Sequence, residues 1–553
     1  MAWVRVASSE AVQEDDVLGV EVGDTALALY RLDGRVFATA GICTHAFAFM
    51  ADGYVEDGTI ECPVHQGRFD IRTGKALCAP LTENLRTYPV REEDGAVFVE
   101  LSQPAQAEDA PAAAPAPAPG PAPASTPKVA PARGAPAAAP GAMSNRFVWP
   151  ADDLSRVPDW VYTSQEIYER ETENIFHGRC WNYVALEAEI PNPGDFIRSN
   201  VGPTPVVVSR AEDGRVHVFE NRCSHRAAEF CRELSGNVRE FVCPYHQWTY
   251  DLTGGLQGVP FRRGVAGAGG MPADFDPALH GARRLNVTTH RGVVFASYVE
   301  DMEPLAEYLG PEILREFEAT FDGREIEILG HYRHSLPGNW KLYHENLKDP
   351  YHATLLHTFL VTFGLLVAGN KSLMLADPTG RHGVMASAKS DASKSVDESS
   401  KKEMRAYKEG MTLHEPRFMD YVPEFDSPWS VTMATIWPNL IVQREMNTLG
   451  IRQIVPTGPH EFIMKWTMFG FRDDSEEMRR HRLRQGNLMG PAGFLGLEDN
   501  EAIKFVQDGM KGVPGGEHLV ALDPDVAMGT SQSLISEAAI RAMYHHWRQE
   551  MGI

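Results

Sequence analysis

The stretch "CSHRAAEFCRELSGNVREFVCPYHQWTYDLTGGLQGVP", residues 223–260, contains a pattern that occurs twice in the chain. A Cys-x-His begins at Cys223 and a Cys-x-x-His begins at Cys243, with 17 residues between these two parts. In the earlier copy the two parts begin at Cys43 and Cys62, with 16 residues between them. Each copy therefore offers two thiolates and two imidazoles from a pair of loops.

Two thiolates and two imidazoles suit a two-iron, two-sulfur cluster in which histidines replace two cysteines on one iron. Such a cluster passes single electrons at a higher potential than an all-cysteine cluster, because imidazole leaves less negative charge on it. A tetrahedral zinc site is the alternative, since zinc takes the same ligand types. The nearly equal spacing of the two copies and the Gly-rich turns around them favour iron and sulfur. The expected ligands are Cys43, His45, Cys62 and His65 in the first copy, and Cys223, His225, Cys243 and His246 in the second.

The patterns around these copies divide the chain into parts. Residues 1–102 and 180–300 alternate short apolar segments with Gly and Asp turns, which predicts two small all-β domains, the second with an N-terminal segment from residue 143. Residues 103–142 repeat Pro and Ala and are expected to form a disordered tether. Residues 301–553 mix longer helical patterns with strands, which predicts an α+β domain with a central antiparallel sheet flanked by helices.

Composition and charge exclude several classes of protein. The 553 residues are 43% hydrophobic and 23% charged, as in ordinary globular domains. The formal net charge of −23 repels nucleic acid and anionic membrane surfaces. No apolar run approaches the roughly 20 residues that cross a bilayer, and residues 1–10 lack the layout of a signal peptide. We therefore expect a cytoplasmic protein without a nucleic-acid or membrane partner.

A second candidate metal site lies in "PGNWKLYHENLKDPYHATLLHTF", residues 337–359. Two histidines and one carboxylate on one face of an iron leave positions open for dioxygen and substrate. On an ideal helix, however, His352 and His357 would point about 140° apart. A shared metal therefore needs a distorted helix, for instance at Pro350. Otherwise one histidine packs in the core and the other is solvated.

The residues around both Cys/His copies resemble one family of enzymes. "CTHAFAFMADGYVEDGTIECPVHQGRFDIRTGKA" resembles a Rieske ferredoxin over residues 1–102. From Pro158 to the end, the chain resembles the large (alpha) subunit of a Rieske non-haem iron aromatic ring-hydroxylating oxygenase. The resemblance implies a ferredoxin fused to a catalytic subunit, with two 2Fe-2S Rieske clusters and one mononuclear Fe(II).

The same resemblance assigns roles around the mononuclear iron. "GPAGFLGLEDNEAI" matches the family segment that carries the carboxylate ligand, so the implied ligands are His352, His357 and Asp499, with Glu498 beside them. Asp349 would bridge a cluster histidine, His246, of one subunit to His352 of the next. The alternatives are a helix-capping role for Asp349 and an exposed helix start at Glu498 and Asp499.

Four segments, "LEAEIPNPGDF", "QGVPFRRG", "ENLKDPYHATLLHTF" and "GPAGF", are most similar to salicylate hydroxylase and anthranilate dioxygenase large subunits. This similarity implies a small aromatic carboxylate as substrate, to which one or both atoms of dioxygen are added. Such a ligand needs an apolar slot for its ring and a donor for its carboxylate. The candidates for lining that slot are Asn346, Leu356, Gln443 and Arg444.

The sequence also indicates what must come from other proteins. It has no plant-type Cys-x4-Cys-x2-Cys run and no Gly-x-Gly-x-x-Gly after a strand, so NADH and FAD are expected only in a separate ferredoxin reductase. The resemblance implies a homotrimer or an assembly with a small beta subunit. Three rivals remain: a monooxygenase or demethylase of the same family, an electron-transfer protein without oxygenase activity, and a structural zinc protein.

Overall fold

The chain forms two compact units, residues 1–128 and 129–553, which are described separately. The predicted tether, residues 103–142, lies outside the described residues. No helix in the described part of the chain is long and apolar enough to span a membrane. The computed structural model describes residues 3–23, 25–44, 49–62, 68–77, 81, 83–101, 147–150, 154–262, 264, 268–363, 365, 371–388, 410–411, 413–513 and 515–553.

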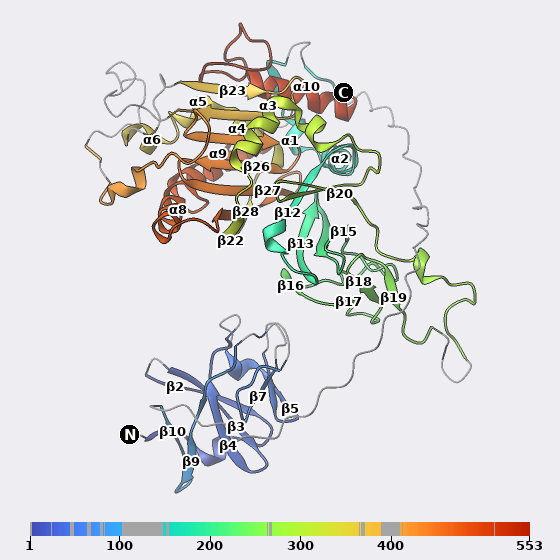
Figure 1. The fold of residues 1–553 in the computed structure, drawn as a ribbon, viewed down its shortest axis with the longest axis vertical. Coiled ribbons are helices and arrows are strands. Elements are labelled where there is room, and N and C mark those ends of the chain that lie inside the picture. Colours follow the sequence, from blue (N-terminus) through green and yellow to red (C-terminus); the bar gives the residue numbers. More distant parts are fainter. Residues whose placement is uncertain are drawn as a thin grey trace. The chain divides into compact units, whose positions relative to one another are not determined.

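The first unit consists of three antiparallel sheets (Figure 1). Its central strand is β3, Thr25–Leu32, whose side chains alternate between two cores. Ala28 and Tyr30 pack in one core with Cys43, whereas Leu27 and Leu29 pack in the other. The sheet orders are β1-β10-β9, β2-β3-β4-β8 and β5-β6-β7. The other strands are β1 Trp3–Ser8, β2 Val17–Val22, β4 Arg35–Ala40, β5 Tyr54–Glu56, β6 Thr59–Glu61, β7 Arg68–Asp70, β8 Thr87–Tyr88, β9 Val90–Glu93 and β10 Ala96–Glu100.

The second unit begins with a β-rich region that contains the second Cys/His copy. Its sheet orders are β12-β21-β20, β15-β14-β13-β16 and β17-β18-β19, and every pair in them is antiparallel. The strands are β12 Asn182–Leu186, β13 Asp195–Val201, β14 Thr204–Arg210, β15 Val216–Glu220, β16 Ser235–Asn237, β17 Glu240–Val242, β18 Thr249–Asp251, β19 Leu256–Gly258, β20 Asn286–His290 and β21 Val293–Ser297.

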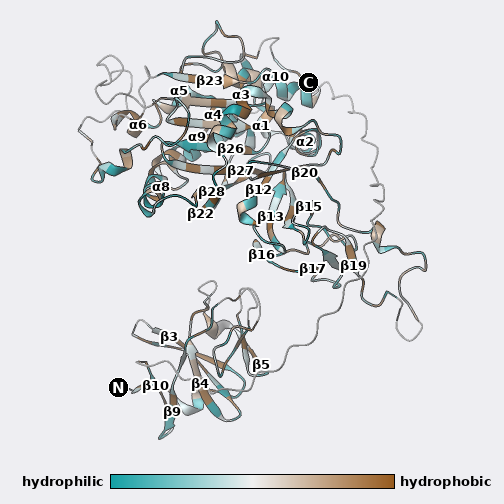
Figure 2. Cartoon of the chain, in the orientation of Figure 1, coloured by the Kyte–Doolittle hydropathy of each residue, from teal (hydrophilic) through white to brown (hydrophobic). Residues whose placement is uncertain are grey.

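A seven-stranded antiparallel sheet with the order β22-β28-β27-β26-β25-β24-β23 organises the rest of this unit. The sequence predicted such a sheet flanked by helices, and the structure has it. In Figure 2 its strands carry many of the residues coloured as hydrophobic. The strands are β22 Ile326–Leu336, β23 Ser372–Ala376, β24 Gly383–Ser387, β25 Val431–Ile436, β26 Leu440–Glu445, β27 Thr448–Gly458 and β28 Glu461–Phe471.

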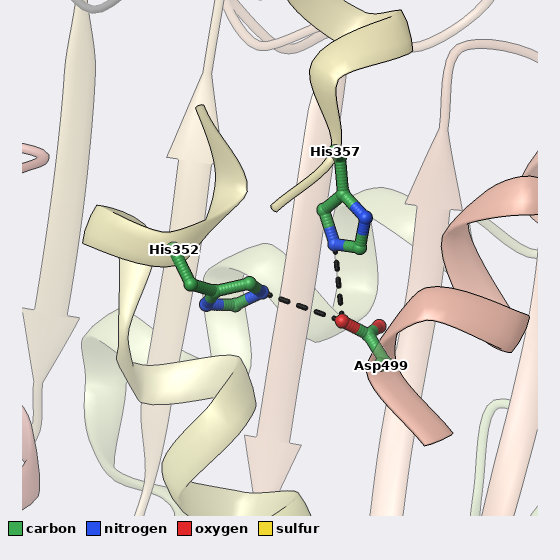
Figure 3. A group of neighbouring side chains, drawn as sticks. All are labelled: His352, His357 and Asp499. Carbon is green, nitrogen blue, oxygen red and sulfur yellow. Dashed lines mark ion pairs between the residues drawn. The ribbon is translucent and has the colours of Figure 1, made fainter. Parts of the chain in front are cut away.

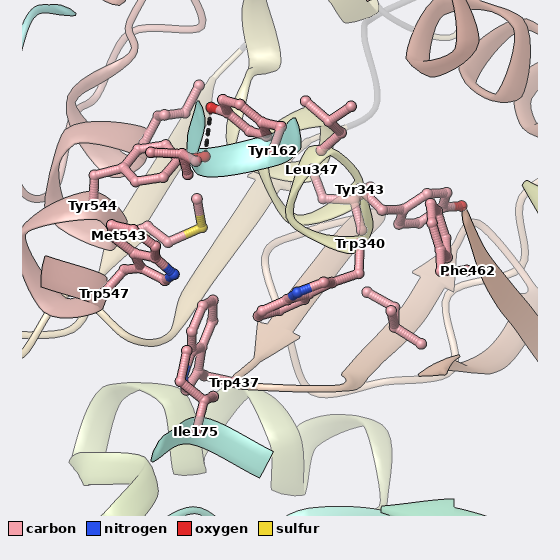
Figure 4. Packing of buried hydrophobic residues seen from close by; sticks show 14 of the residues in the cluster. Tyr162, Ile175, Trp340, Tyr343, Leu347, Trp437, Phe462, Met543, Tyr544 and Trp547 are labelled. Atoms are coloured by element: carbon pink, nitrogen blue, oxygen red, sulfur yellow. Dashed lines mark hydrogen bonds between the residues drawn. The ribbon is translucent and has the colours of Figure 1, made fainter. Parts of the chain in front are cut away.

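Helices cover this sheet on both faces. One face packs against α4, α9 and α10 through an aromatic core that includes Trp340, Trp437 and Trp547 (Figure 4). The other face packs against α3 and against Trp181 and Phe295 of the β-rich region. The helices of this unit are α1 Trp160–Thr163, α2 Gln165–Glu171, α3 Leu305–Thr320, α4 Trp340–Lys348, α5 Pro350–Ala353, α6 Thr358–Thr362, α8 Glu476–Met489, α9 Phe494–Gly512 and α10 Ala538–Met551. A short strand pair, β11 Arg156–Pro158 with β29 Glu517–Leu519, joins the start of the unit to its later part.

Candidate functional site

The segment from α4 to α6 is a broken helix, and the break decides where its histidines point. Pro350 disfavours helical geometry in the residue before it, and Asp349 has φ −107° and ψ 82°. The Asp349 carboxylate caps α5, because it accepts bonds from the N–H groups of Tyr351 at 3.0 Å and His352 at 3.3 Å. His357 is also non-helical and precedes α6. The angle of about 140° expected on one ideal helix therefore does not apply.

The break brings His352 and His357 to one carboxylate, Asp499 of α9 (Figure 3). The Nε2 atom of His352 lies 3.4 Å from Asp499 Oδ1, and the Nε2 atom of His357 lies 3.0 Å from it. All three ligand atoms lie within 4.8 Å of one another. Among the described residues this is the single group of three or more His, Cys, Asp or Glu side chains that converges in this way.

The Nδ1 atoms of both imidazoles, on the side away from Asp499, also have partners. His357 Nδ1 lies 2.7 Å from Glu498 Oε2. His352 Nδ1 contacts the main-chain oxygen of Asp349 and lies 3.4 Å from its Oδ2 atom. Such partners fix the tautomer and orientation of a metal-binding histidine, and here they leave both Nε2 atoms for a metal. Two imidazoles and one carboxylate fit ferrous iron with open positions.

The three candidate ligands shift one another's pKa values. Burial disfavours ionised Asp499, but its bonds to His352 and His357 outweigh burial and hold the pKa of Asp499 well below its usual range. Burial likewise lowers the pKa of His352, but its bonds to Asp349 and Asp499 outweigh this effect and raise that pKa to about 10. The pKa of His357 is raised too, because Asp499 and Glu498 outweigh its burial. The site therefore favours positive charge beside a buried carboxylate.

Asn346, on the last turns of α4, lies next to these ligands. Its Nδ2 atom is 3.1 Å from Asp499 Oδ1 and 3.3 Å from His352 Nε2. Its Oδ1 atom is buried and has no hydrogen-bond partner in the described part of the chain. The amide therefore has unused bonding capacity beside the candidate metal position.

A cavity whose empty space, including the part open to solvent, is about 760 Å³ opens onto the three ligands. Its walls are mainly apolar, and no Lys or Arg among the described residues lines it. The lining residues are Asn346, Leu347, Asp349, Pro350, His352, Ala353, His357, Leu360, Leu365, Met385, Ser387, Ser430, Val431, Met433, Glu445, Met446, Met489, Leu495 and Asp499.

Only one of the four pocket candidates from the sequence, Asn346, lines this cavity. Leu356 is half-buried outside the cavity lining. Gln443 also lies outside the lining, and its Nε2 atom donates to the main-chain oxygen of Met489 at 3.0 Å. Arg444 lies on the opposite face of the sheet, because successive side chains of a strand alternate. Its Nη2 donates to Ser427 Oγ at 2.8 Å. The structure gives no support to a substrate role for Arg444.

The sequence did not indicate the polar wall of the cavity. Glu445 lies two residues after Gln443 on β26, and its Oε2 atom accepts a hydrogen bond from Gln443 Nε2 at 2.9 Å. Burial raises the pKa of Glu445 above its usual range. Ser387 of β24 and Ser430, just before β25, add hydroxyl groups. The alternation along "LIVQRE" could have placed Glu445 with Gln443, but only sheet pairing brings Ser387 here.

The second Cys/His copy forms two matching loops. Cys223 and Cys243 are buried, and the rings of His225 and His246 lie nearer the surface with their centroids 4.5 Å apart. In each loop an N–H four residues after the cysteine donates to the cysteine main-chain oxygen at 2.9 Å. Trp248 stacks on His225 with a centroid distance of 4.9 Å and an interplanar angle of 6°.

The spacing of these four side chains distinguishes the candidate cofactors. Around one zinc ion all donor atoms would lie within about 4 Å of one another, since Zn–S is about 2.3 Å. The four side chains of this copy do not form such a group within 4.8 Å. His225 Nδ1 is buried and has no hydrogen-bond partner among the residues that the structure describes. The loops thus fit a larger cluster that takes this nitrogen as a ligand.

The first copy is described only in part. Cys43 and Cys62 are buried in one core with Phe69. His45 and His65, the two predicted imidazole ligands, lie outside the described residues.

Comparison with protein families agrees with these sites. A model of the Rieske [2Fe-2S] domain matches residues 2–89 and 180–268, and a model of the ring hydroxylating alpha subunit catalytic domain matches residues 324–553. The chain therefore belongs to the alpha subunits of the Rieske non-haem iron ring-hydroxylating oxygenases, which are oxidoreductases. The predicted class of enzyme is confirmed, and the electron-transfer-only and zinc alternatives are disfavoured.

Individual relatives refine this placement. The chain is 46% identical to the large oxygenase component of salicylate 5-hydroxylase from Ralstonia sp., over 73% of this chain and 96% of that protein. It is 42% identical to the anthranilate 1,2-dioxygenase large subunit from Burkholderia cepacia, over 73% of this chain and 95% of that protein. A naphthalene 1,2-dioxygenase from Rhodococcus sp. has the same fold, with a TM-score of 0.60 at 22% identity over 72% of this chain and 94% of that one.

Proposed function

We propose that this chain is a terminal oxygenase that carries its own Rieske electron donor and adds dioxygen to a small aromatic acid. The observation that carries the proposal is the convergence of His352, His357 and Asp499 at the edge of a mainly apolar cavity. The two matches to the Rieske model support a donor domain in residues 1–102, joined by a tether over residues 103–142 to the oxygenase.

His352, His357 and Asp499 would hold the mononuclear iron, which supplies the electron transfer that dioxygen needs to react. Glu498 and Asp349 orient the two imidazoles, and the apolar walls exclude water from the site. The Rieske clusters would be held by Cys43, His45, Cys62 and His65, and by Cys223, His225, Cys243 and His246.

The polar wall supports a ring with two different substituents. Salicylate and anthranilate, in the names of two relatives, each carry a carboxylate beside a hydrogen-bond donor, a hydroxyl or an amino group. Glu445 can accept a bond from such a donor, whereas Ser387 and Ser430 can donate to a carboxylate. The ring itself would lie against Met385 and Met433.

Electrons would enter from a separate NADH- and FAD-dependent reductase and pass through both clusters to the iron. Asp349 contacts His352, which is compatible with a bridge to His246 of the partner subunit. Such a bridge requires a neighbouring subunit, for which we propose a homotrimer or an assembly of three alpha and three beta subunits. The cap that Asp349 provides to α5 does not exclude the bridge, because the cap uses Oδ1 and leaves Oδ2 available.

The test is turnover of the purified chain with NADH, a ferredoxin reductase, isotopically labelled dioxygen and a panel of salicylate, anthranilate, benzoate and uncharged aromatics. We expect labelled product from an acid with a neighbouring donor group, and none from the Asp499→Ala variant. The number of labelled atoms distinguishes mono- from dioxygenation. Product only from uncharged aromatics, with all iron present, would overturn the substrate class.

A further inference from the structure

A second cavity lies where α8 meets β22, the edge strand of the seven-stranded sheet (Figure 1). Its empty space, including the part open to solvent, is about 700 Å³. Nothing lies within 4 Å of the position that a Cβ atom would take at Gly330 of β22, so the cavity is open on this side. Apolar side chains of β22, β27, β28 and α8 form much of its wall, among them Leu329, Leu449, Phe469 and Leu483.

The wall of this second cavity has no free charge for an ionic ligand. Among the described lining residues, Arg482 is the one permanent cation. Every nitrogen of its guanidinium donates to Glu424 or Asp474, at distances from 2.6 to 2.9 Å. His331 is the other basic group, and its partial burial lowers its pKa, which favours the neutral ring. The second cavity therefore suits a small uncharged ligand.

One row of paired residues leads from the second cavity to the cavity at the iron ligands. In the sheet register Met468 lies opposite Gly330 on one side and Gly450 on the other. Gly450 lies opposite Gln443, which lies opposite Met433. Met468 lines the second cavity, and Met433 lines the cavity at the iron ligands. Because directly paired residues of antiparallel strands point to the same face, this row connects the two cavities along one face of the sheet.

Helix α8 covers the same row. Gly486 of α8 lines the second cavity, and Met489, three residues later, lines the cavity at the iron ligands. Residues three apart on a helix are neighbours on its surface. Met468 reaches α8 near Gly486, and Gln443 donates to Met489 O at 3.0 Å. The side chains of Met468 and Gln443 thus separate the two cavities.

Met468 is surrounded by three glycines, Gly330, Gly450 and Gly486. A Cβ atom would lie 3.4 Å from Met468 Sδ at Gly450 and 3.6 Å from Met468 Cε at Gly486. None of the three has a positive φ, so their backbone conformation does not require glycine. Glycine also destabilises helices and strands relative to alanine. What the three positions share is space for a methionine, which is unbranched and flexible, to change its rotamer.

We propose that dioxygen enters through the second cavity and that Met468 is the gate between this cavity and the one at the iron ligands. Dioxygen is small, apolar and uncharged, as the wall requires, and a change of the Met468 rotamer opens enough space for it. The aromatic acid is larger and charged, so it needs another entrance. This inference rests on the proposed function, because it requires that dioxygen is consumed at the iron ligands.

Xenon tests the cavity without turnover, because this apolar atom occupies dry apolar cavities as dioxygen would. In xenon-pressurised crystals of the full-length chain, we expect a xenon site in the second cavity of the wild type. We expect none in Gly486→Leu, whose added side chain fills that space. Gly509→Leu is the matched control, because Gly509 is an exposed helix glycine with nothing within 4 Å of its Cβ position. A wild-type second cavity without xenon would overturn the inference.

Turnover at varied dioxygen concentration, with a saturating aromatic acid, tests the gate. Gly486→Leu should lower kcat/KM for dioxygen about tenfold and leave the dissociation constant of the acid unchanged. Adding Met468→Ala to this variant should restore kcat/KM, because the shorter side chain reopens the route. Gly509→Leu should behave as the wild type. Gly486→Ala adds a Cβ atom whose nearest neighbour is Met468 Cε at 3.6 Å, so it should fold and lower kcat/KM by a smaller factor.

The outcomes separate this inference from the proposed function. If Gly486→Leu folds, forms product and keeps the wild-type kcat/KM for dioxygen, the gate is disproved and the proposed function stands. The same holds if Gly486→Leu does not fold and Gly486→Ala keeps the wild-type value. If the wild type forms no product from any aromatic acid, the proposed function fails and the inference fails with it.

Discussion

At the scale of single residues, His357 lies between two adjacent carboxylates. Asp499 meets its Nε2 atom at 3.0 Å, and Glu498 meets its Nδ1 atom at 2.7 Å. Adjacent residues of a helix point about 100° apart, so α9 can reach both edges of one imidazole that projects toward it. One dipeptide thus supplies a candidate ligand and also the group that orients another ligand.

Replacing Glu498 by Gln tests the orienting group. We expect iron to bind the mononuclear site about 10–100-fold more weakly, because a neutral amide holds the imidazole less firmly and makes it less basic. The measurement is iron retention in a chelator titration, with the cluster absorption as an internal standard. Glu501→Gln, an exposed change on the same helix, is the control. Equal retention in all three proteins would contradict the orienting role.

Asp349→Asn tests the electron bridge and separates it from the cap. Asparagine caps a helix about as well as aspartate, and the main-chain oxygen of residue 349 still contacts His352 Nδ1, so fold and metal content should persist. If Asp349 is the bridge, the loss of charge should slow reduction of the mononuclear site at least about tenfold, since a carboxylate bonded to both imidazoles would provide the short route. Single-turnover product formation from a pre-reduced protein measures this rate. An unchanged rate would leave Asp349 with only its capping role.

At the scale of elements, α4 also carries His344, a histidine outside the candidate metal site whose protonation depends on burial. His344 is fully buried, and its Nε2 atom donates to Pro438 O at 2.8 Å. Its Nδ1 atom has no hydrogen-bond partner among the described residues. Burial, helped by the positive charge of Lys348, lowers the pKa of His344 to about 3. At a pH below 6.5, the ordinary pKa of histidine, His344 is protonated in the unfolded chain but stays neutral in the folded chain until the pH approaches 3.

The contribution of neutral His344 to the stability of this unit should therefore be complete above pH 6.5 and should be lost as the pH drops from there toward 3. In the His344→Gln variant, the free energy of unfolding should fall less steeply as the pH drops. Below pH 6.5 the slope should be smaller than that of the wild type by up to about 1.4 kcal/mol per pH unit. Thermal unfolding of the second unit at pH 7.5 and pH 5.5 measures the difference in slope. The slope is the readout, so a lower absolute stability does not matter. His414→Gln, at an exposed position, should keep the wild-type slope.

At the scale of the whole molecule, the proposed arrangement joins donor and acceptor in one chain. In that arrangement the Pro- and Ala-rich segment 103–142, predicted to be a tether, would replace a diffusive encounter by an effective concentration in about the millimolar range. The relatives that match 73% of this chain are covered almost completely by it, at 95% and 96% of their length. About a quarter of this chain therefore has no counterpart in those alignments, and the proposed donor unit would account for that part.

A protease site inserted near residue 120 tests the tether. Before cleavage, turnover per enzyme with excess reductase should not depend on enzyme concentration. After cleavage, turnover at about 1 μM should fall at least tenfold and recover as the concentration rises, because transfer becomes bimolecular. The uncut insertion variant and a cut sample at about 1 mM are the controls. A cleaved enzyme with undiminished turnover at high dilution would show that the tether does not set the encounter rate.

Much of the fold could be predicted from the sequence because it depends on local periodicity. The strands of residues 1–102 and 180–300, and the antiparallel sheet flanked by helices, follow from alternating and helical patterns. The substrate cavity could not be predicted in this way. Met385 and Ser387 of β24 reach it only because β24 pairs with β25, and nothing in the local sequence specifies that pairing.

The chemical groups that this protein can use are readable from its residues: two Cys/His copies, two histidines five residues apart and an acidic dipeptide on a later helix. Their positions relative to one another follow from the folded chain. The break at Pro350 turns His352 and His357 toward Asp499, and strand alternation turns Arg444 away from the cavity. The physical reason is that ligand type is a property of a side chain, whereas convergence depends on backbone direction and on contacts between distant segments.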